Sequence, residues 1–251
     1  MKTLTILNQK GGVGKTTTCH ALGGALSLRG ERVLFIDLDS QCNLTYSLGG
    51  EIGDGDIIDA LENPTSVRDT IQETDQGDLI AGSPDLARLN ADYRGREDME
   101  RLKEALKPIK KNYDHIIIDT PPALGALMVN ALTACDGALI TAQADIYSLQ
   151  GVGQLMGTLK EVRENTNKKL KVLGLLLTRY NERVNLSKKL INDLNAFTKE
   201  IGIKVLDTKI RESVALRESQ LNRKSIFEHS RRSNGAKDYE ALLEELIKEG
   251  L

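Results

Sequence analysis

One octapeptide constrains the fold of this chain more than any other feature. Residues 10–17 read Lys-Gly-Gly-Val-Gly-Lys-Thr-Thr, after the apolar run Leu4–Leu7 and before a helix-compatible stretch, Thr17–Leu28. Glycines let a loop curl until its N–H groups converge on one anion, and the start of the next helix adds a positive dipole end. The pattern therefore predicts a phosphate-binding loop between a strand and a helix. The alternative is a glycine-rich turn that only connects the two elements.

Two side chains of this octapeptide suit a bound polyphosphate. Lys15 is expected to reach the β- and γ-phosphates, and the Thr16 hydroxyl is expected to ligate Mg²⁺. The residues expected to hold the nucleotide in this segment are Lys10, Gly11, Gly12, Val13, Gly14, Lys15, Thr16 and Thr17.

The rest of the chain predicts an α/β fold. Short apolar runs alternate with helix-period stretches, which is typical of a mostly parallel twisted sheet with helices on both faces. Because 251 residues suffice for one such core, we expect a single P-loop domain over residues 1–251, without an N-terminal helix-turn-helix extension. The expected strands are Thr3–Asn8, Arg32–Asp37, Asp78–Ala81, His115–Asp119, Gly137–Ala142, Lys171–Thr178 and Lys204–Thr208. The expected later helices are Asp98–Lys111, Leu149–Asn165, Leu186–Glu200 and Asn234–Glu249.

Composition argues against several other classes of protein. No apolar run approaches the roughly 18 residues of a membrane span, and the first strand begins too early to leave room for a signal peptide. The three cysteines are widely spaced, give no metal or disulfide pattern and suit a reducing compartment. We therefore expect a cytoplasmic protein.

Aspartates end two further apolar strands, at the edge where parallel sheets bind ligands. Asp37 and Asp39 lie in the segment Phe35–Gln41, and strand alternation places both on the same side. Asp119 follows the run Ile116–Ile118 in a Walker B arrangement, which holds Mg²⁺ through coordinated water. The alternative for the first pair is that both carboxylates cap the helix that follows.

Taken together, the three motifs resemble the deviant Walker A ATPases, the family of ParA/Soj partition proteins, MinD and the nitrogenase iron protein. The octapeptide carries the family's second lysine, here Lys10, and Asp119–Pro122 reads Asp-Thr-Pro-Pro as in ParA-type chains. The resemblance covers nearly the whole chain and implies ATP and Mg²⁺ as cofactors, with Lys10 reaching the ATP of a second subunit. It also implies that Asp39 orients or activates the attacking water, while Asp37 supports the metal shell. The expected catalytic residues are thus Lys10, Lys15 and Asp39, and the expected metal residues are Thr16, Asp37, Asp39 and Asp119.

This sequence departs from the family pattern in the switch that contains Asp39. Ser40 stands where proline is usual and Cys42 where glycine is usual, and both changes are expected to loosen the switch backbone. In relatives the position of Arg179 approaches the adenine base. We therefore expect Arg179 to stack on the nucleotide or to contact the other subunit, the alternative being an ordinary exposed arginine.

The last third of the chain is basic although the whole chain is not. Residues 179–233 hold 13 Lys and Arg against 7 Asp and Glu, in a chain whose net charge is −2. Such an asymmetry is typical of a localised phosphate-binding face, and the alternative is a solvated charged surface. The family's usual Arg-rich segment before the final helices has no clear copy here. The residues expected to contact DNA phosphates are Lys188, Lys189, Arg217, Arg223, Lys224, Arg231 and Arg232.

The resemblance implies a timed switch that segregates plasmid or chromosomal DNA. ATP would join two subunits into a homodimer that binds double-stranded DNA without sequence preference and associates with the nucleoid. A ParB-like adaptor protein would then stimulate hydrolysis and release the dimer. Two other functions stay open, an ATPase that positions a protein cargo and a MinD-like membrane switch. The tail Tyr239–Leu251 disfavours the membrane, because it carries four glutamates against one lysine and anionic lipid repels it. Its apolar residues Leu242, Leu243, Leu246 and Ile247 are expected to form a packing face.

Overall fold

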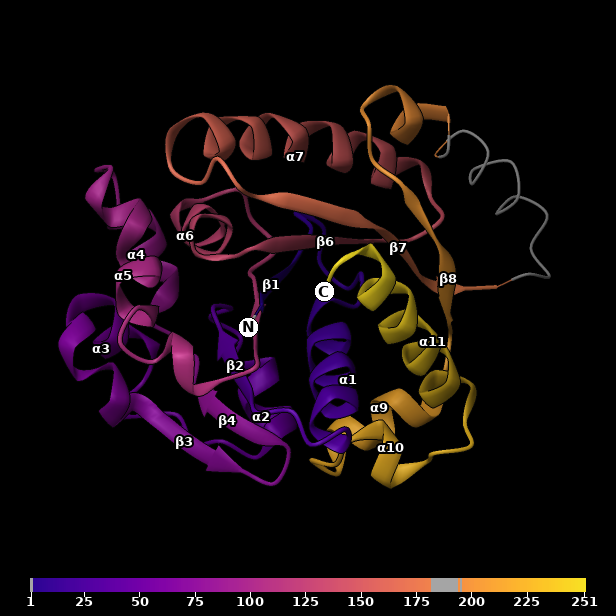
Figure 1. Ribbon diagram of the computed structural model, residues 1–251, viewed down its shortest axis with the longest axis horizontal. Helices are drawn as coiled ribbons and strands as arrows, with labels where there is room; N and C mark the ends of the chain where they lie inside the picture. The colour runs from indigo at the N-terminus through magenta and orange to yellow at the C-terminus, as the bar shows by residue number, and fades with distance from the viewer. Residues whose placement is uncertain (1, 182–193, 195) are drawn as a thin grey trace.

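The computed structural model, which describes residues 2–181, 194 and 196–251, is built on one eight-stranded sheet (Figure 1). The strand order is β3-β4-β2-β5-β1-β6-β7-β8, and every neighbouring pair is parallel except β3 and β4. The strands are β1 (Lys2–Leu7), β2 (Val33–Asp37), β3 (Ile71–Thr74), β4 (Gly77–Ile80), β5 (His115–Asp119), β6 (Gly137–Ala142), β7 (Lys171–Tyr180) and β8 (Val205–Arg211). The predicted α/β fold with a mostly parallel sheet is confirmed.

Helices cover both faces of this sheet (Figure 1). One face carries α1 (Lys15–Leu28), α2 (Asn43–Leu48), α9 (Val214–Leu221), α10 (Ile226–His229) and α11 (Asn234–Glu249). The other carries α3 (Ile57–Glu62), α4 (Leu86–Asp92), α5 (Arg101–Leu106), α6 (Ala126–Ala134) and α7 (Ile146–Asn165). Short 3₁₀ segments are η1 (Pro64–Thr70), η2 (Glu97–Glu100) and η3 (Lys110–Asn112).

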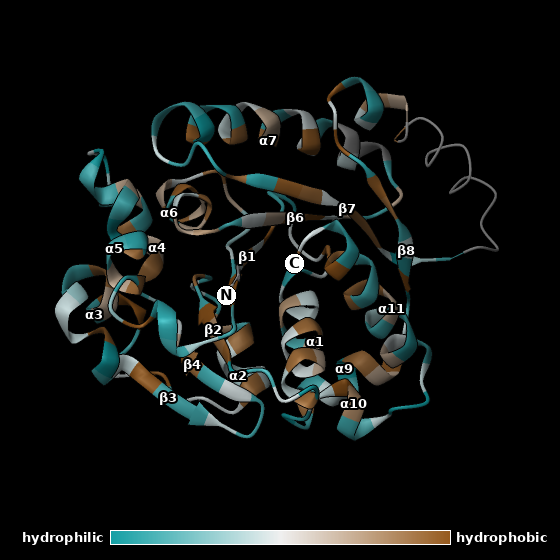
Figure 2. Cartoon of the chain, in the orientation of Figure 1, coloured by the Kyte–Doolittle hydropathy of each residue, from teal (hydrophilic) through white to brown (hydrophobic). Residues whose placement is uncertain are grey.

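Strand alternation explains why the core has two sides. In β5, Ile117 belongs to the hydrophobic cluster that contains α1 and α11, whereas Ile116 and Ile118 belong to the cluster on the opposite face. A parallel strand covered on both faces needs an apolar residue at nearly every position. All positions of β2 and β6 are accordingly buried, and hydrophobic residues recur along β7 in Figure 2.

The predicted elements agree with the structure best where the pattern is long and uninterrupted. The helix Asn234–Glu249 is found at its predicted bounds, and each predicted strand overlaps an observed one. The predicted helix Asp98–Lys111 is wrong as a single element, because η2, α5 and η3 divide it, and Pro108 cannot continue a helix. The antiparallel edge strand β3 has no counterpart in the prediction, and most of the predicted helix Leu186–Glu200 lies outside the described residues.

The apolar face of α11 is occupied by the protein's own core. Leu242, Leu243 and Leu246 are fully buried in the cluster that contains α1, as predicted. The Tyr239 hydroxyl lies 3.0 Å from the Thr18 hydroxyl and ties the two helices together. Ile247 was expected on this face too, but it is 43% exposed. In the part of the chain that the structure describes, no helix has the length and apolarity to cross a bilayer.

A buried histidine in α1 predicts a pH dependence of stability. His20 is 1% exposed, and burial lowers its pKa to about 4. The unfolded chain takes up this proton near pH 6.5, so native stability falls as the pH drops from about 6.5 towards 4. Between pH 7 and pH 4.5, we expect the unfolding free energy of the wild type to fall by about 2 kcal/mol more than that of His20→Gln. Urea denaturation at both pH values measures this, and equal losses would contradict it.

Candidate nucleotide-binding and hydrolysis site

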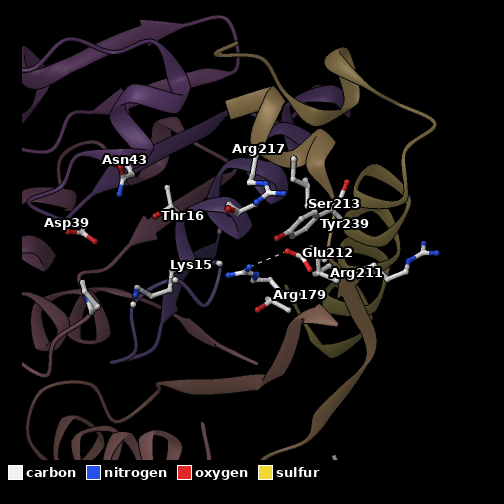
Figure 3. Close-up of a pocket in the computed structure, with 18 of the residues that line it drawn as sticks. Lys15, Thr16, Asp39, Asn43, Arg179, Arg211, Glu212, Ser213, Arg217 and Tyr239 are labelled. Atoms are coloured by element: carbon white, nitrogen blue, oxygen red, sulfur yellow. Dashed lines mark hydrogen bonds and ion pairs between the residues drawn. The ribbon is translucent and has the colours of Figure 1, made fainter. Parts of the chain in front are cut away.

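The carboxyl ends of β1, β5 and β2 bring the three sequence motifs together. These strands are neighbours, and their registers pair Asp119 with both Ile6 and Asp37. The loop after β1 therefore begins close to the carboxylates of Asp119 and Asp37. A cleft of about 420 Å³ lies at this edge, between the loop, the switch after β2, the ends of β7 and β8, and the start of α9 (Figure 3).

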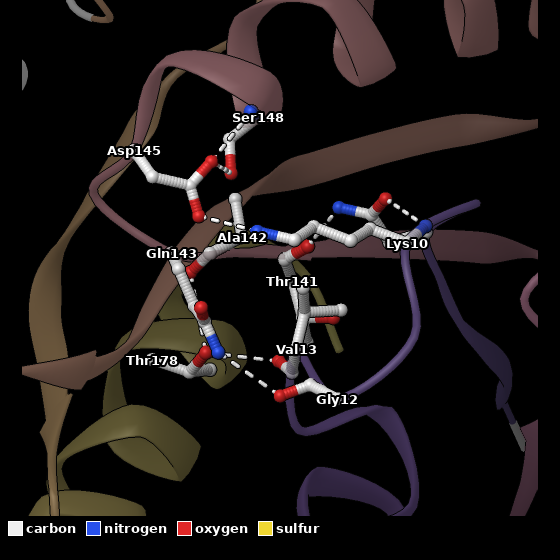
Figure 4. Close-up of polar contacts among 10 residues, drawn as sticks. Lys10, Gly12, Val13, Thr141, Ala142, Gln143, Asp145, Ser148 and Thr178 are labelled. Atoms are coloured by element: carbon white, nitrogen blue, oxygen red, sulfur yellow. Dashed lines mark hydrogen bonds and ion pairs between the residues drawn. The ribbon is translucent and has the colours of Figure 1, made fainter.

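The predicted phosphate-binding loop has the required backbone and is braced from behind. Gly12 (φ 74°) and Gly14 (φ 81°) are left-handed, whereas Gly11 is not. The Thr178 hydroxyl donates to the Val13 carbonyl at 2.8 Å, and the Gln143 side-chain amide donates to the Gly12 carbonyl at 3.0 Å (Figure 4). These two bonds turn loop carbonyls backwards, which leaves loop N–H groups for an anion.

Lys15 and Thr16 begin α1 and face the cleft. The Lys15 ammonium is 3.3 Å from the Lys10 carbonyl, so it already lies across the loop. Burial lowers the pKa of Lys15, although Asp119 and Asp39 oppose this shift. The Thr16 hydroxyl donates to Asp119 Oδ2 at 2.6 Å. The two groups that were expected near Mg²⁺ are therefore adjacent.

The environment of Asp119 suits a cation. Asp119 is fully buried, and burial followed by the neighbouring Asp37 carboxylate raises its pKa to about 8. A divalent cation beside Thr16 and Asp119 would offset that unfavourable charge. Mg²⁺ takes one or two protein oxygens and completes its shell with water and phosphate, and the Thr16 hydroxyl and the Asp119 carboxylate could supply such oxygens.

Asp37 lies behind the cleft and holds the switch helix α2. Its Oδ2 accepts both the N–H and the hydroxyl of Thr45 at 2.9 Å, and its Oδ1 accepts the Asp39 N–H at 3.1 Å. Burial raises the pKa of Asp37 to about 6, against these hydrogen bonds. The sequence left helix capping open as an alternative, and in this structure Asp37 does cap the first turn of α2.

Asp39 lies beyond the end of β2 and does line the cleft. Its Oδ1 accepts the Gln41 N–H at 3.1 Å, and its carbonyl accepts the Cys42 N–H at 2.8 Å. Cys42 is left-handed, with φ of 53°, which explains why glycine suits this position. Two backbone hydrogen bonds thus hold the turn at Asp39, although Ser40 and Cys42 replace the usual proline and glycine of the family.

The second lysine, Lys10, points away from the cleft of its own chain. Its ammonium lies 2.5 Å from Asp145 Oδ2 (Figure 4). Asp145 also caps α7, because its Oδ1 accepts the Ser148 N–H at 2.9 Å. Burial raises the pKa of Asp145, but the bonds from Lys10 and Ser148 outweigh it, so that the pKa is lowered overall.

Most of the cleft wall formed by the ends of β7 and β8 and the start of α9 is not predicted by the sequence. Arg179, which was predicted, is there in a left-handed conformation (φ 50°) and pairs with Glu212 at 3.2 Å. The β8–α9 segment beside it carried no recognisable motif. The lining residues that are not among the predicted site residues are Gln41, Asn43, Pro122, Thr178, Ile210, Arg211, Glu212, Ser213, Leu216 and Tyr239, of which Gln41 and Pro122 lie within the predicted motifs.

The residues expected to contact DNA fall into three groups. Lys188 and Lys189 lie outside the described residues. Arg223 lies over the Tyr46 ring at 4.9 Å, Lys224 pairs with Glu228 at 2.8 Å, and Arg231 and Arg232 are exposed between α10 and α11. Arg217 lines the cleft.

Comparison with known proteins identifies full-length relatives. A family model described as an AAA domain matches residues 1–172. The sporulation initiation inhibitor protein Soj of Bacillus subtilis is 39% identical over 254 residues, which cover 99% of each chain. The chromosome partitioning protein ParA of Myxococcus xanthus is 35% identical over 250 residues, covering 98% of this chain and 87% of its own.

A solved structure supports the same assignment of the fold. Cobyrinic acid a,c-diamide synthase from Mycobacterium smegmatis superimposes with a TM-score of 0.84 and 32% sequence identity, covering 99% of this chain and 94% of that one. It was solved with ADP and magnesium bound, and also with an ATP analogue and magnesium.

Proposed function

This chain belongs to the ParA/Soj family of chromosome-partitioning ATPases, and on that basis we propose that it is an ATP-driven DNA-segregation switch. ATP and Mg²⁺ would assemble two subunits, the dimer would bind DNA, and hydrolysis would release it. The observation that carries the proposal is one cleft that unites the braced loop, the Thr16–Asp119 pair and Asp39.

The chemistry of the cleft is positioning and charge neutralisation, as phosphoryl transfer requires. Lys15 and the loop N–H groups would bind the phosphates, and Thr16 and Asp119 would hold Mg²⁺. When bound, Mg²⁺ neutralises charge on the transferred phosphate. Asp39 is the carboxylate of the switch that faces the cleft, so it would orient the attacking water. Arg179, at the end of β7, would contact the base end of the nucleotide.

The orientation of Lys10 supports an exchange between subunits. The Lys10 side chain is directed to Asp145 and not into its own cleft. It could therefore exchange the ion pair with Asp145 for one with the phosphates bound to a second subunit. An exposed or half-exposed ion pair holds such a side chain by only about 1 kcal/mol, so a partner's phosphates could displace Asp145. ATP would then bridge the two subunits.

Exposed basic residues after α9 support a DNA-binding face. Arg223, Lys224, Arg231 and Arg232 come from the α9–α11 segment, on the same side of the sheet as α1. Contacts of this kind with phosphates carry no sequence information and weaken with salt. Two copies in a dimer would double the basic face, which would make DNA binding depend on ATP. A ParB-like adaptor would set the time of release, on the nucleoid.

Random-sequence duplex DNA tests the proposal. We expect binding at least about tenfold tighter with ATP than with ADP or no nucleotide, with Asp39→Ala holding the ATP state. Replacing Arg231 and Arg232 by Gln should flatten the slope of log affinity against log salt by about 1 to 2 units. If ATP drives dimerisation but no state binds DNA, the DNA cargo is wrong and the rival reading, a positioned protein cargo, replaces it.

A further inference from the structure

Three of the four basic residues that line the cleft are already engaged, and one is not. Lys15 bonds a loop carbonyl at 3.3 Å, whereas Arg179 and Arg211 pair with carboxylates at 3.2 and 2.5 Å. Arg217 of α9 forms no hydrogen bond or ion pair with any described residue. In Figure 3, Arg217 and Arg179 approach the cleft from opposite sides, while Arg211 points away from it. The Arg217 charge is therefore left for a ligand.

The position of α9 places Arg217 beside the phosphates. Gln220 lies one turn further along the same helix face, and its side-chain oxygen accepts the Thr17 hydroxyl at 3.3 Å. Thr17 directly follows Lys15 and Thr16, at the start of the helix whose N–H groups cradle the α- and β-phosphates. Arg217 thus approaches the phosphate chain at the end nearer Thr17.

We propose that Arg217 binds the phosphate chain of the nucleotide, and that it is not part of the DNA face. A guanidinium donates two parallel N–H bonds to a phosphate, which gives both affinity and orientation. Arg217 would close the cleft from the α9 side. This inference rests on the nucleotide role proposed above and assigns Arg217 to the ligand for which that cleft is built.

Nucleotide affinity of Arg217→Gln tests this assignment, because the side chain is exposed and its loss does not threaten the fold. Fluorescent ATP and ADP analogues with Mg²⁺ are expected to bind about tenfold more weakly, since one charge-assisted contact is lost. Adenosine, which lacks phosphates, should bind the variant and the wild type equally. Arg217→Lys should recover part of the lost affinity. A loss of adenosine binding as large as that of ATP would overturn the phosphate assignment in favour of base stacking.

Two matched variants separate this inference from the proposed function. Arg88→Gln removes the same charge from an exposed helical arginine outside the cleft, and it should bind ATP like the wild type. With both proteins saturated with ATP, Arg217→Gln should keep wild-type DNA affinity, whereas Arg232→Gln should not. If Arg217→Gln binds ATP and ADP within twofold of the wild type but binds DNA more weakly, the inference is wrong. If the wild type binds no DNA at all, the DNA proposal fails but the nucleotide comparison still decides the role of Arg217.

Discussion

Lys10→Ala is expected to lower ATP turnover about 10³-fold or more, while the affinity of the monomer for ATP stays close to that of the wild type. The structure gives the reason for both halves of this result. Lys10 is directed to Asp145 and not into its own cleft, so a single subunit should bind ATP without it. A cation delivered by a second subunit would stabilise the charge of the transferred phosphate only in the assembled dimer, as an arginine finger supplied by a partner does.

Mixing two inactive variants tests whether Lys10 acts in the other subunit. Asp39→Ala keeps Lys10 but lacks the carboxylate that we propose positions the water, and Lys10→Ala keeps Asp39. A mixed dimer would contain one complete site, made of Asp39 from one chain and Lys10 from the other. An equimolar mixture should therefore recover about a quarter of wild-type turnover, because half of the dimers are mixed and each has one working site. If the mixture stays inactive although both variants dimerise with ATP, Lys10 acts within its own chain.

Contiguous motifs made the phosphate-binding loop and the Asp119 site predictable from the sequence. Residues 10–17 carry the loop, and Asp119 follows an uninterrupted apolar strand. The parallel order of β1, β5 and β2 then places them together with no further information. The braces behind the loop could not be predicted in this way. Thr178 and Gln143 contact residues more than 130 positions earlier in the chain, and a lone Thr or Gln at a strand end has no recognisable signal.

The end of β2 shows how a correct motif can still give the wrong geometry. Strand alternation predicts Asp37 and Asp39 on one side, but β2 stops at Asp37 and the chain then turns. Asp37 consequently faces Thr45 of α2, and Asp39 alone lines the cleft. Arg217 is a similar case, because a count of charges cannot tell a residue that faces solvent from one that faces a cleft.

Asp119→Asn is expected to stabilise the protein without nucleotide and to remove the stabilisation that MgATP gives. In the wild type, burial and Asp37 raise the pKa of Asp119 to about 8, far above the value of an unfolded aspartate. The native state then holds a proton that the unfolded chain has released, so native stability falls as the pH rises from about 4 to 8. The amide carries no charge and keeps acceptor oxygen for the Thr120 N–H. We therefore expect the variant without nucleotide to be more stable than the wild type by at least about 2 kcal/mol at pH 8, with a smaller difference at pH 6.

The same substitution should remove the stabilisation by MgATP, because Thr16 loses its carboxylate partner where we propose that Mg²⁺ binds. Saturating ligand at 100 times its dissociation constant stabilises the wild type by about 2.7 kcal/mol, and the variant should show almost none of this gain. Urea denaturation at pH 6 and 8, with and without MgATP, measures both effects. Asp114→Asn is the matched control at the other end of β5, because Arg32 holds the pKa of that exposed carboxyl well below its usual range. That control should not gain stability and should still be stabilised by MgATP. If Asp119→Asn is instead less stable than the wild type at pH 8, the fold itself compensates the buried carboxylate, which then needs no cation.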